Sequence, residues 1–87
     1  MSADARDVRL RRLRIRSWRR GIREMDLILG GYADEALETL GAGSLDRFEA
    51  LLAEDDDDLY RWIASGGDVP GKHAEMVGRL RARHGTP

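Results

Sequence analysis

The stretch from Trp18 to Leu29, WRRGIREMDLIL, organises the rest of the chain. Its apolar residues Trp18, Ile22, Met25 and Leu29 follow one another at intervals of 4, 3 and 4 residues. This spacing is typical of one buried face of a helix. The charged residues of the stretch lie between these positions. The pattern therefore predicts an amphipathic helix that packs its apolar face against the remainder of the chain.

A possible contact site lies within the same stretch, at Arg20, Gly21 and Glu24. Residues four apart share a helix face, so Arg20 and Glu24 are expected to lie side by side. Glycine costs about 0.5–1 kcal/mol relative to alanine inside a helix, but it lets another surface approach the backbone closely. One hypothesis is an Arg, a Glu and bare backbone presented to a partner. The alternative is a solvated ion pair of about 0.3–0.5 kcal/mol, with a glycine that only marks a turn.

Two motifs in the chain resemble one known family. Residues 20–24 match an RGxxE motif, with Asp26 and an apolar run following it, and residues 56–63, DDDLYRWI, are similar to a D-x-D-L-[FY]-x-W-[LI] element. Both are found at this spacing in the succinate dehydrogenase assembly factor 2 family, which includes the bacterial SdhE proteins and yeast Sdh5. The resemblance covers roughly residues 8–83. It implies a small helical bundle.

Length and composition indicate one small domain, residues 1–87, with residues 1–5 and 84–87 expected to be loose. The chain has no cysteine, which excludes a disulfide framework, a thiol nucleophile and a cysteine metal site. No apolar run approaches the roughly 20 residues that span a bilayer, so membrane insertion is not expected. The opening lacks the apolar region of a secretory signal peptide.

Charge is distributed unevenly along the chain. Residues 6–23 hold nine arginines and one aspartate, whereas residues 24–58 hold twelve acidic residues and one arginine. Such an opening could bind nucleic-acid phosphates or an anionic membrane. The overall isoelectric point near 6.1 argues against nucleic acid, and the apolar residues do not form one clean face for a membrane. A small helical regulator that binds nucleic acid, or an antitoxin-like protein, remains the alternative function.

Periodicity predicts an all-α fold, a small antiparallel bundle of about five helices. A first helix is expected over residues 4–16, with Val8 and Ile15 on the face that Ile22 and Leu29 continue, and Leu10 and Leu13 on another side. Ser17 is expected to cap the next helix, residues 20–40, which Gly30-Gly31 should kink. Whether these two helices are continuous is left open.

The second half of the chain predicts three further helices. Residues 41–43 end the second helix with a left-handed glycine, and Ser44 caps a third helix that extends to about Glu54. The acidic run 54–58 opens a short fourth helix, because aspartates at a helix start satisfy free N–H groups. A loop over 65–71 precedes a fifth helix, residues 72–83. The inward residues are predicted to be Leu45, Phe48, Leu51, Leu52, Leu59, Trp62, Ile63, Met76, Val77 and Leu80.

The inventory of reactive groups favours a binding protein over an enzyme. The aspartate run lacks the spacing of a calcium loop. His73 and His84 show no metal-ligand spacing and are expected at the surface. No nucleophile with a base and no glycine-rich phosphate loop is present. We therefore predict no catalytic residue, no metal site and no tightly bound cofactor.

The family resemblance supplies a specific function. It implies an assembly factor that binds the flavoprotein subunit of succinate dehydrogenase, with that of fumarate reductase left open, and promotes covalent attachment of FAD to a histidine there. Arg20, Gly21 and Glu24 would form the central contact, and the protein would act as a monomer. Secondary candidates are Arg16, Arg19, Arg23 and Asp26. Because the opening is poor in serine and carries Asp4 and Asp7, a bacterial cytoplasmic protein is expected rather than a mitochondrial one.

Overall fold

The computed structural model describes residues 2–84, and the side chains of residues 5–84. Within this range the chain forms five α-helices and two short 3₁₀-helices, with no strand, which confirms the predicted all-α class. The chain divides between Thr39 and Leu40 into two compact units, described separately below. That residues 1–87 act as a single domain stays a prediction. The elements are α1 (Ser2–Trp18), α2 (Arg23–Ala36), η1 (Leu37–Thr39), α3 (Ala42–Leu52), α4 (Asp56–Ser65), η2 (Gly71–His73) and α5 (Ala74–His84).

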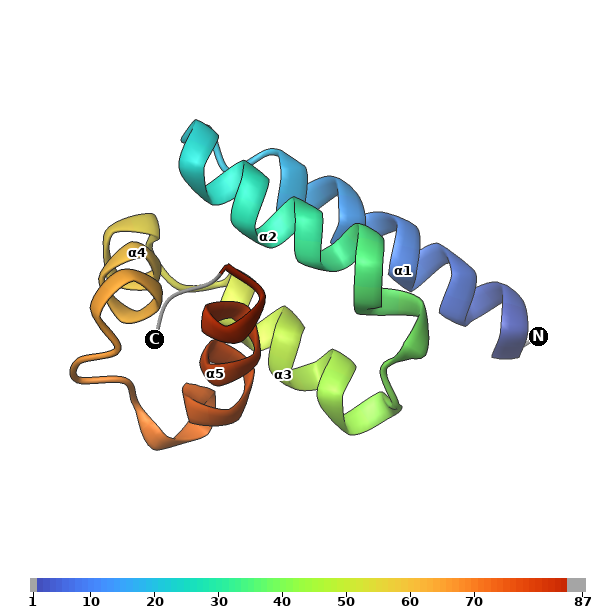
Figure 1. Cartoon of the computed structure of the whole chain (residues 1–87). Helices are drawn as coiled ribbons and strands as arrows, with labels where there is room; N and C mark the ends of the chain where they lie inside the picture. Colours follow the sequence, from blue (N-terminus) through green and yellow to red (C-terminus); the bar gives the residue numbers. More distant parts are fainter. Residues whose placement is uncertain (1, 85–87) are drawn as a thin grey trace. The chain divides into compact units, whose positions relative to one another are not determined.

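The first unit is an antiparallel pair of helices, α1 and α2, followed by η1 (Figure 1). Arg6, near the amino terminus of α1, contacts η1, because its Nη2 donates to the Glu38 carbonyl oxygen at 3.1 Å. A carboxy-terminal residue of α1 meets α2, since Nε1 of Trp18 donates to Oδ2 of Asp34 at 3.2 Å. Helix α1 already includes residues 2–5, which were expected to be loose.

Of the two apolar sides that the sequence predicted for α1, one is buried and the other is exposed. Leu10 and Leu13 are buried, whereas Val8 and Ile15 are exposed at 46% and 48%. Ser17 lies on the same buried stripe, and its Oγ donates to the Leu13 carbonyl oxygen at 2.7 Å instead of capping a following helix. The prediction was wrong because it extended the spacing of residues 22 and 29 back through residues 19–22, where the chain is not helical.

Helix α2 continues through Gly30 and Gly31 without the expected break. Gly30 is buried beneath the Trp18 ring, so closely that an added Cβ atom would lie 2.3 Å from the nearest ring carbon, Cδ2. A glycine inside a helix normally reduces stability, but here it removes the side chain that would keep the indole away. Close packing between α1 and α2 therefore explains why a glycine occupies position 30.

The second unit contains α3, α4, η2 and α5. All ten residues predicted to point inward from these helices are buried, which confirms that part of the core. The caps predicted for the starts of α3 and α4 are both wrong. Gly41 has a φ of −73° and precedes α3 as its N-cap, so Ser44 lies inside α3. Asp55 occupies the N-cap position of α4 without a side-chain hydrogen bond, and the aspartates of the first turn lie where the helix dipole favours negative charge.

Helix α4 ends at a residue in the left-handed conformation, Gly66, with a φ of 74°. The side chain of Arg81, from α5, reaches this end. Its Nη1 donates to the carbonyl oxygens of Trp62, at 3.3 Å, and of Ile63, at 2.8 Å. Arg81 thus hydrogen-bonds carbonyl groups in the last turn of α4. The contact ties α5 to α4.

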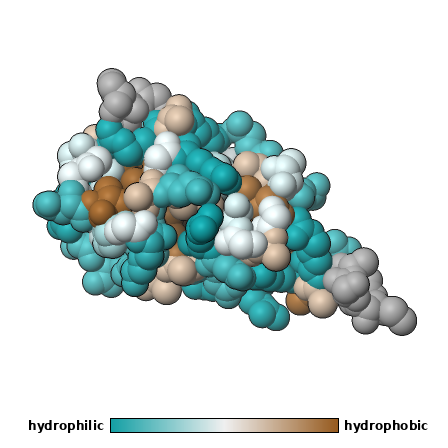
Figure 2. All heavy atoms as spheres, turned by 90° about the horizontal axis from the view of Figure 1, so that it is seen from below, coloured by the Kyte–Doolittle hydropathy of each residue, from teal (hydrophilic) through white to brown (hydrophobic). Residues whose placement is uncertain are grey.

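The face of the molecule drawn in Figure 2 is largely polar. On the face drawn in Figure 2, hydrophobic side chains gather in small patches within a hydrophilic surface. Among residues 2–84, no helix combines the length and the apolar character that crossing a bilayer requires.

Candidate functional site

The predicted contact residues surround the turn that joins α1 to α2, residues 19–22. Gly21 adopts a φ of 91°, in the region that residues with a Cβ atom rarely occupy. The turn is held from α2, because Oδ1 of Asp26 accepts a hydrogen bond from the Arg20 backbone N–H at 2.7 Å. Ile22 then takes the N-cap position, with its carbonyl oxygen accepting from the Asp26 backbone N–H at 3.0 Å. The local sequence thus specifies a defined turn and not a continuous helix.

Because of this turn, the predicted arrangement of Arg20 and Glu24 is wrong. Because α1 ends at Trp18 and α2 begins at Arg23, the two residues do not share a helix face. Arg20 lies in the turn and is half-buried, whereas Glu24 is exposed in the first turn of α2. The positive φ of Gly21 is the physical reason, since it diverts the backbone from a helical path. A turn was the alternative role that the sequence left open for this glycine, and the structure shows that turn.

Gly21 lies in open space as well as in an unusual conformation. A Cβ atom built on it would have no neighbour within 4 Å. Glycine at this position therefore leaves bare backbone at the surface, as the sequence hypothesis required. That a partner approaches this backbone stays a prediction.

The secondary candidates lie on both sides of the turn. Arg19 and Arg23 are exposed and flank it, whereas Arg16 is half-buried in the last turn of α1. The Asp26 carboxylate is occupied by the Arg20 backbone, so the structure gives it a role in shaping the turn.

Apolar side chains beside the turn are more exposed than the sequence suggested. Trp18 is 38% exposed, Ile22 is 45% exposed and Leu27 is 49% exposed. Ile22 was predicted to be in the core, and Leu27 had not been singled out. The glycine in front of Ile22 was the available signal, because a turn at that position ends the helical periodicity. The polar motif is thus bordered by accessible apolar surface.

The second unit contains a buried histidine that the sequence analysis placed at the surface. His73 is only 1% exposed, and its Nε2 lies 2.6 Å from Oε2 of Glu54. Its ring packs against Trp62 with 5.6 Å between centroids. The hydrogen bond with His73 lowers the pKa of Glu54 below its ordinary value of 4.5, and burial opposes this by raising it. His84 is exposed, as expected.

The Glu54–His73 pair predicts a specific dependence of stability on acid. A carboxyl group whose pKa is lowered by folding binds fewer protons in the native state than in the unfolded state. Its contribution is therefore present above the unfolded pKa near 4.5 and is lost as the pH falls through the lower native value. We expect Glu54→Gln to be less stable than wild type at neutral pH and to lose less of its stability below pH 4.5.

Urea unfolding as a function of pH measures this effect. Glu49→Gln, at a half-buried position of α3, removes the same charge and serves as the control. An acid-induced loss of stability in Glu54→Gln equal to that of wild type would contradict the assignment.

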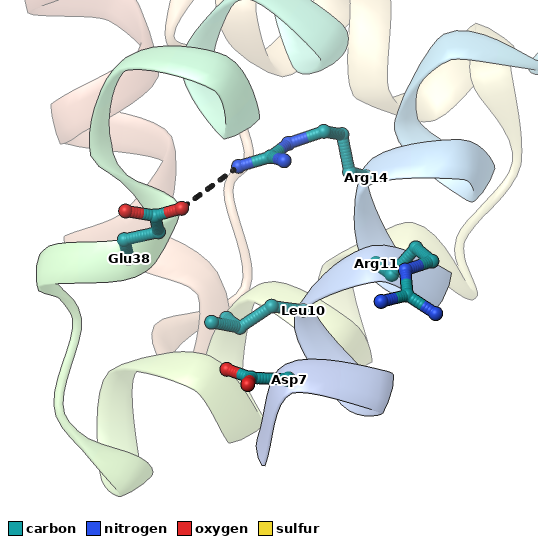
Figure 3. A pocket seen from close by; sticks show the side chains of 5 residues that line it. All are labelled: Asp7, Leu10, Arg11, Arg14 and Glu38. Atoms are coloured by element: carbon teal, nitrogen blue, oxygen red, sulfur yellow. Dashed lines mark ion pairs between the residues drawn. The ribbon is translucent and has the colours of Figure 1, made fainter. Parts of the chain in front are cut away.

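A small polar hollow lies in the first unit, lined by residues of α1 and η1 (Figure 3). Its volume is about 180 Å³, below the roughly 300–1,000 Å³ of typical ligand pockets. Arg14 points toward Glu38 across it, with Nη2 lying 3.7 Å from Oε1. The charges that line the hollow are thus partly paired within the unit. The lining residues are Asp7, Leu10, Arg11, Arg14 and Glu38.

Among the residues that the structure describes, which include the aspartates around the start of α4, no group of three or more His, Asp or Glu side chains is arranged to hold an ion.

Comparison with known proteins identifies the family. Residues 11–84 match the family model for Sdh5, described as a flavinator of succinate dehydrogenase. Relatives named mitochondrial succinate dehydrogenase assembly factor 2 include proteins of Meyerozyma guilliermondii, 37% identical over 68 residues, and Candida glabrata, 42% identical over 80 residues. The aligned regions cover 78% and 86% of this chain. No solved structure matches the chain.

The relatives are longer proteins, and their names correct one expectation. The chain spans about half the length of the two relatives, 50% and 52%. The expectation of a bacterial cytoplasmic protein is contradicted, because the relatives are named as mitochondrial proteins of fungi. The composition of the opening residues led to the wrong prediction, because the residues that fold a domain do not indicate the compartment in which it works. The family model and the relatives together show that the chain belongs to the Sdh5 family, the succinate dehydrogenase assembly factor 2 proteins.

Proposed function

We propose that this protein binds the flavoprotein subunit of succinate dehydrogenase and promotes covalent attachment of FAD to it. The family description, a flavinator of succinate dehydrogenase, supports this assignment. The observation that carries it is the exposed turn at residues 19–22, where Gly21 leaves bare backbone and Glu24 stands beside it. A defined turn of this kind can offer one fixed contact surface to a partner.

Each motif residue receives a role from its position. The Arg20 guanidinium pairs with a carboxylate or a backbone acceptor of the partner, in a charge-assisted hydrogen bond. Gly21 permits close approach of the partner, and Glu24 accepts hydrogen bonds from the partner's donors. Arg19 and Arg23 extend the contact on either side, with Arg16 beyond them. Asp26 acts within the chain by holding the Arg20 backbone at 2.7 Å.

The protein is proposed to act as a monomeric, non-enzymatic factor without a resident cofactor. FAD and the attachment histidine belong to the flavoprotein subunit, so the chemistry of attachment takes place there. The flavoprotein subunit of fumarate reductase is a second partner to test by the same assay.

In-gel flavin fluorescence of the denatured flavoprotein subunit tests the proposal. Cells lacking this protein would receive wild type, Glu24→Ala or the control Glu35→Ala. Glu35 is also exposed on α2 and lies eleven residues further on, roughly 16 Å along the helix. We expect a weak covalent flavin band in the deletion strain, recovery with wild type and with Glu35→Ala, and at least a tenfold weaker band with Glu24→Ala.

A flavin band that is unchanged by the deletion would overturn this function. The alternative of a nucleic-acid-binding regulator would then be tested by RNA and DNA binding, whose affinity should fall steeply with salt. A band restored equally by Glu24→Ala and wild type would retain the function and reject the site.

A further inference from the structure

The solvent-facing side of α1 carries an ordered stripe that the proposed contact uses only at its last residue, Arg19. Its four members within α1 are spaced 3, 1 and 3 residues apart, so they follow one another along a single helix face, and the fifth follows directly after the helix. All five are exposed, and the four helical members lie on the side opposite the buried Leu10 and Leu13. We call this stripe the outer face of α1. It consists of Val8, Arg11, Arg12, Ile15 and Arg19.

Two aliphatic residues lie among the arginines of the outer face. Val8 and Ile15 keep 46% and 48% of their surface exposed. They are seven residues apart, which places them about 10.5 Å from each other along the helix. Single exposed aliphatic residues are common. A β-branched pair on one face, in a helix that does not bury it, offers two neighbouring apolar contacts to another molecule.

The charge around this pair is strongly positive. Helix α1 contains six arginines and two aspartates, and Arg19 follows directly after it. Two members of the stripe are free to face outward, since Arg12 is exposed and the Arg11 side chain points away from Glu38 in Figure 3. The outer face therefore complements a surface that carries both carboxylates and exposed aliphatic side chains.

We propose that the outer face of α1 is a second contact surface, which binds an acidic region bearing aliphatic side chains on the flavoprotein subunit. The inference rests on the proposed function. The stripe ends at Arg19, in the turn that contains Gly21, so the two contact surfaces are continuous. Arginine provides directional hydrogen bonds to carboxylates, and Val8 and Ile15 add apolar area between these charges.

The chemistry of the stripe favours a protein over the other anionic partners. Phosphates of a nucleic acid would pair with the arginines but would leave Val8 and Ile15 without apolar contacts. An anionic membrane selects helices with a broad apolar face rich in large side chains, and this face has two branched aliphatic residues. A protein surface supplies carboxylates and aliphatic side chains together.

Binding of the purified chain to the purified flavoprotein subunit, measured at several salt concentrations, tests this inference. We expect the double variant Arg11→Glu/Arg12→Glu to bind at least tenfold more weakly and with less salt dependence, because like charges would then face each other. Ile15→Ser is expected to bind about fivefold more weakly through loss of an apolar contact. Arg11→Gln/Arg12→Gln provides a milder second variant, and helical circular dichroism verifies folding.

Arg47→Glu is the matched control for charge. Arg47 lies on α3, and its replacement by Glu changes the net charge by the same amount per residue as the double variant on α1. The replacement also removes one exposed ion pair, between Arg47 and Glu75 at 3.2 Å. We expect its affinity to stay within about threefold of wild type, since exposed pairs contribute little. An equal loss with Arg47→Glu would attribute the effect to net charge and overturn the inference.

The other outcomes separate this inference from the proposed function. If wild type does not bind the flavoprotein subunit, the proposed function and the second surface both fail. If wild type binds and the α1 variants bind equally well, the second surface alone is rejected. It is also rejected if these variants bind the subunit normally but lose binding to single-stranded RNA or to phosphatidylserine vesicles.

Discussion

Replacing Gly30 by alanine is expected to lower the free energy of unfolding by about 1–3 kcal/mol, the usual effect of overpacking a close contact. The added methyl group would lie 2.3 Å from a ring carbon of Trp18, so the indole must move or the helices must separate. Movement of the ring would also disturb its hydrogen bond to Asp34. Urea unfolding followed by tryptophan fluorescence and far-UV circular dichroism measures the loss.

The same substitution at Gly78 provides a control with the opposite sign. Gly78 lies within α5, and a Cβ atom built on it would have no neighbour within 4 Å. Alanine there should stabilise the protein by about 0.5–1 kcal/mol through the helix preference alone. If Gly30→Ala stabilised the protein as Gly78→Ala does, the close packing of Trp18 over α2 would be wrong.

Substitution of Gly21 is expected to have the second large effect, on partner binding more than on folding. A residue with a Cβ atom would project into open space, where nothing within 4 Å obstructs it. It would also strain a backbone whose φ is 91°, at a cost of about 1–2 kcal/mol. We therefore expect Gly21→Arg to remain folded by circular dichroism and to reduce covalent flavin attachment at least tenfold.

Gly21→Asn separates the two roles of this glycine, since asparagine accepts positive φ more readily than other residues. If the partner approaches the Gly21 backbone, Gly21→Asn should fold normally and still lose flavin attachment. Gly41→Ala is the control, because Gly41 has an ordinary φ of −73° and equally open surroundings. A full flavin band with Gly21→Asn would limit the role of Gly21 to its conformation, and an unfolded Gly21→Arg would contradict the prediction.

Sequence periodicity predicted the second unit well because its helices bury regular apolar stripes. Phe48, Trp62 and Leu80 are all in the core, as their spacing indicated. In the first unit the same argument failed at Ile22, since a turn with a left-handed glycine separates it from the helix before it. Periodicity reports which residues share a face only where the chain remains helical.

The motifs determined the family, since both blocks lie within the region that the family model matches. They predicted contact residues, but the prediction that Arg20 and Glu24 share a helix face is wrong. The turn itself depends on a hydrogen bond from the Arg20 backbone to Asp26, which no pattern of residue types displays. The candidate site could therefore be located from the sequence, but its shape could not.

By itself, the sequence determined the helical class, the core of the second unit and the family, because these follow from local spacing and short motifs. Only the tertiary structure decided the burial of His73, whose Nε2 lies 2.6 Å from Oε2 of Glu54, nineteen residues away. It also decided the use of Arg81 at the end of α4 and the packing of Trp18 over Gly30. Each of these contacts joins residues that are far apart in the chain, and local periodicity carries no information about which distant side chain will satisfy a buried polar group or fill the space left by a glycine.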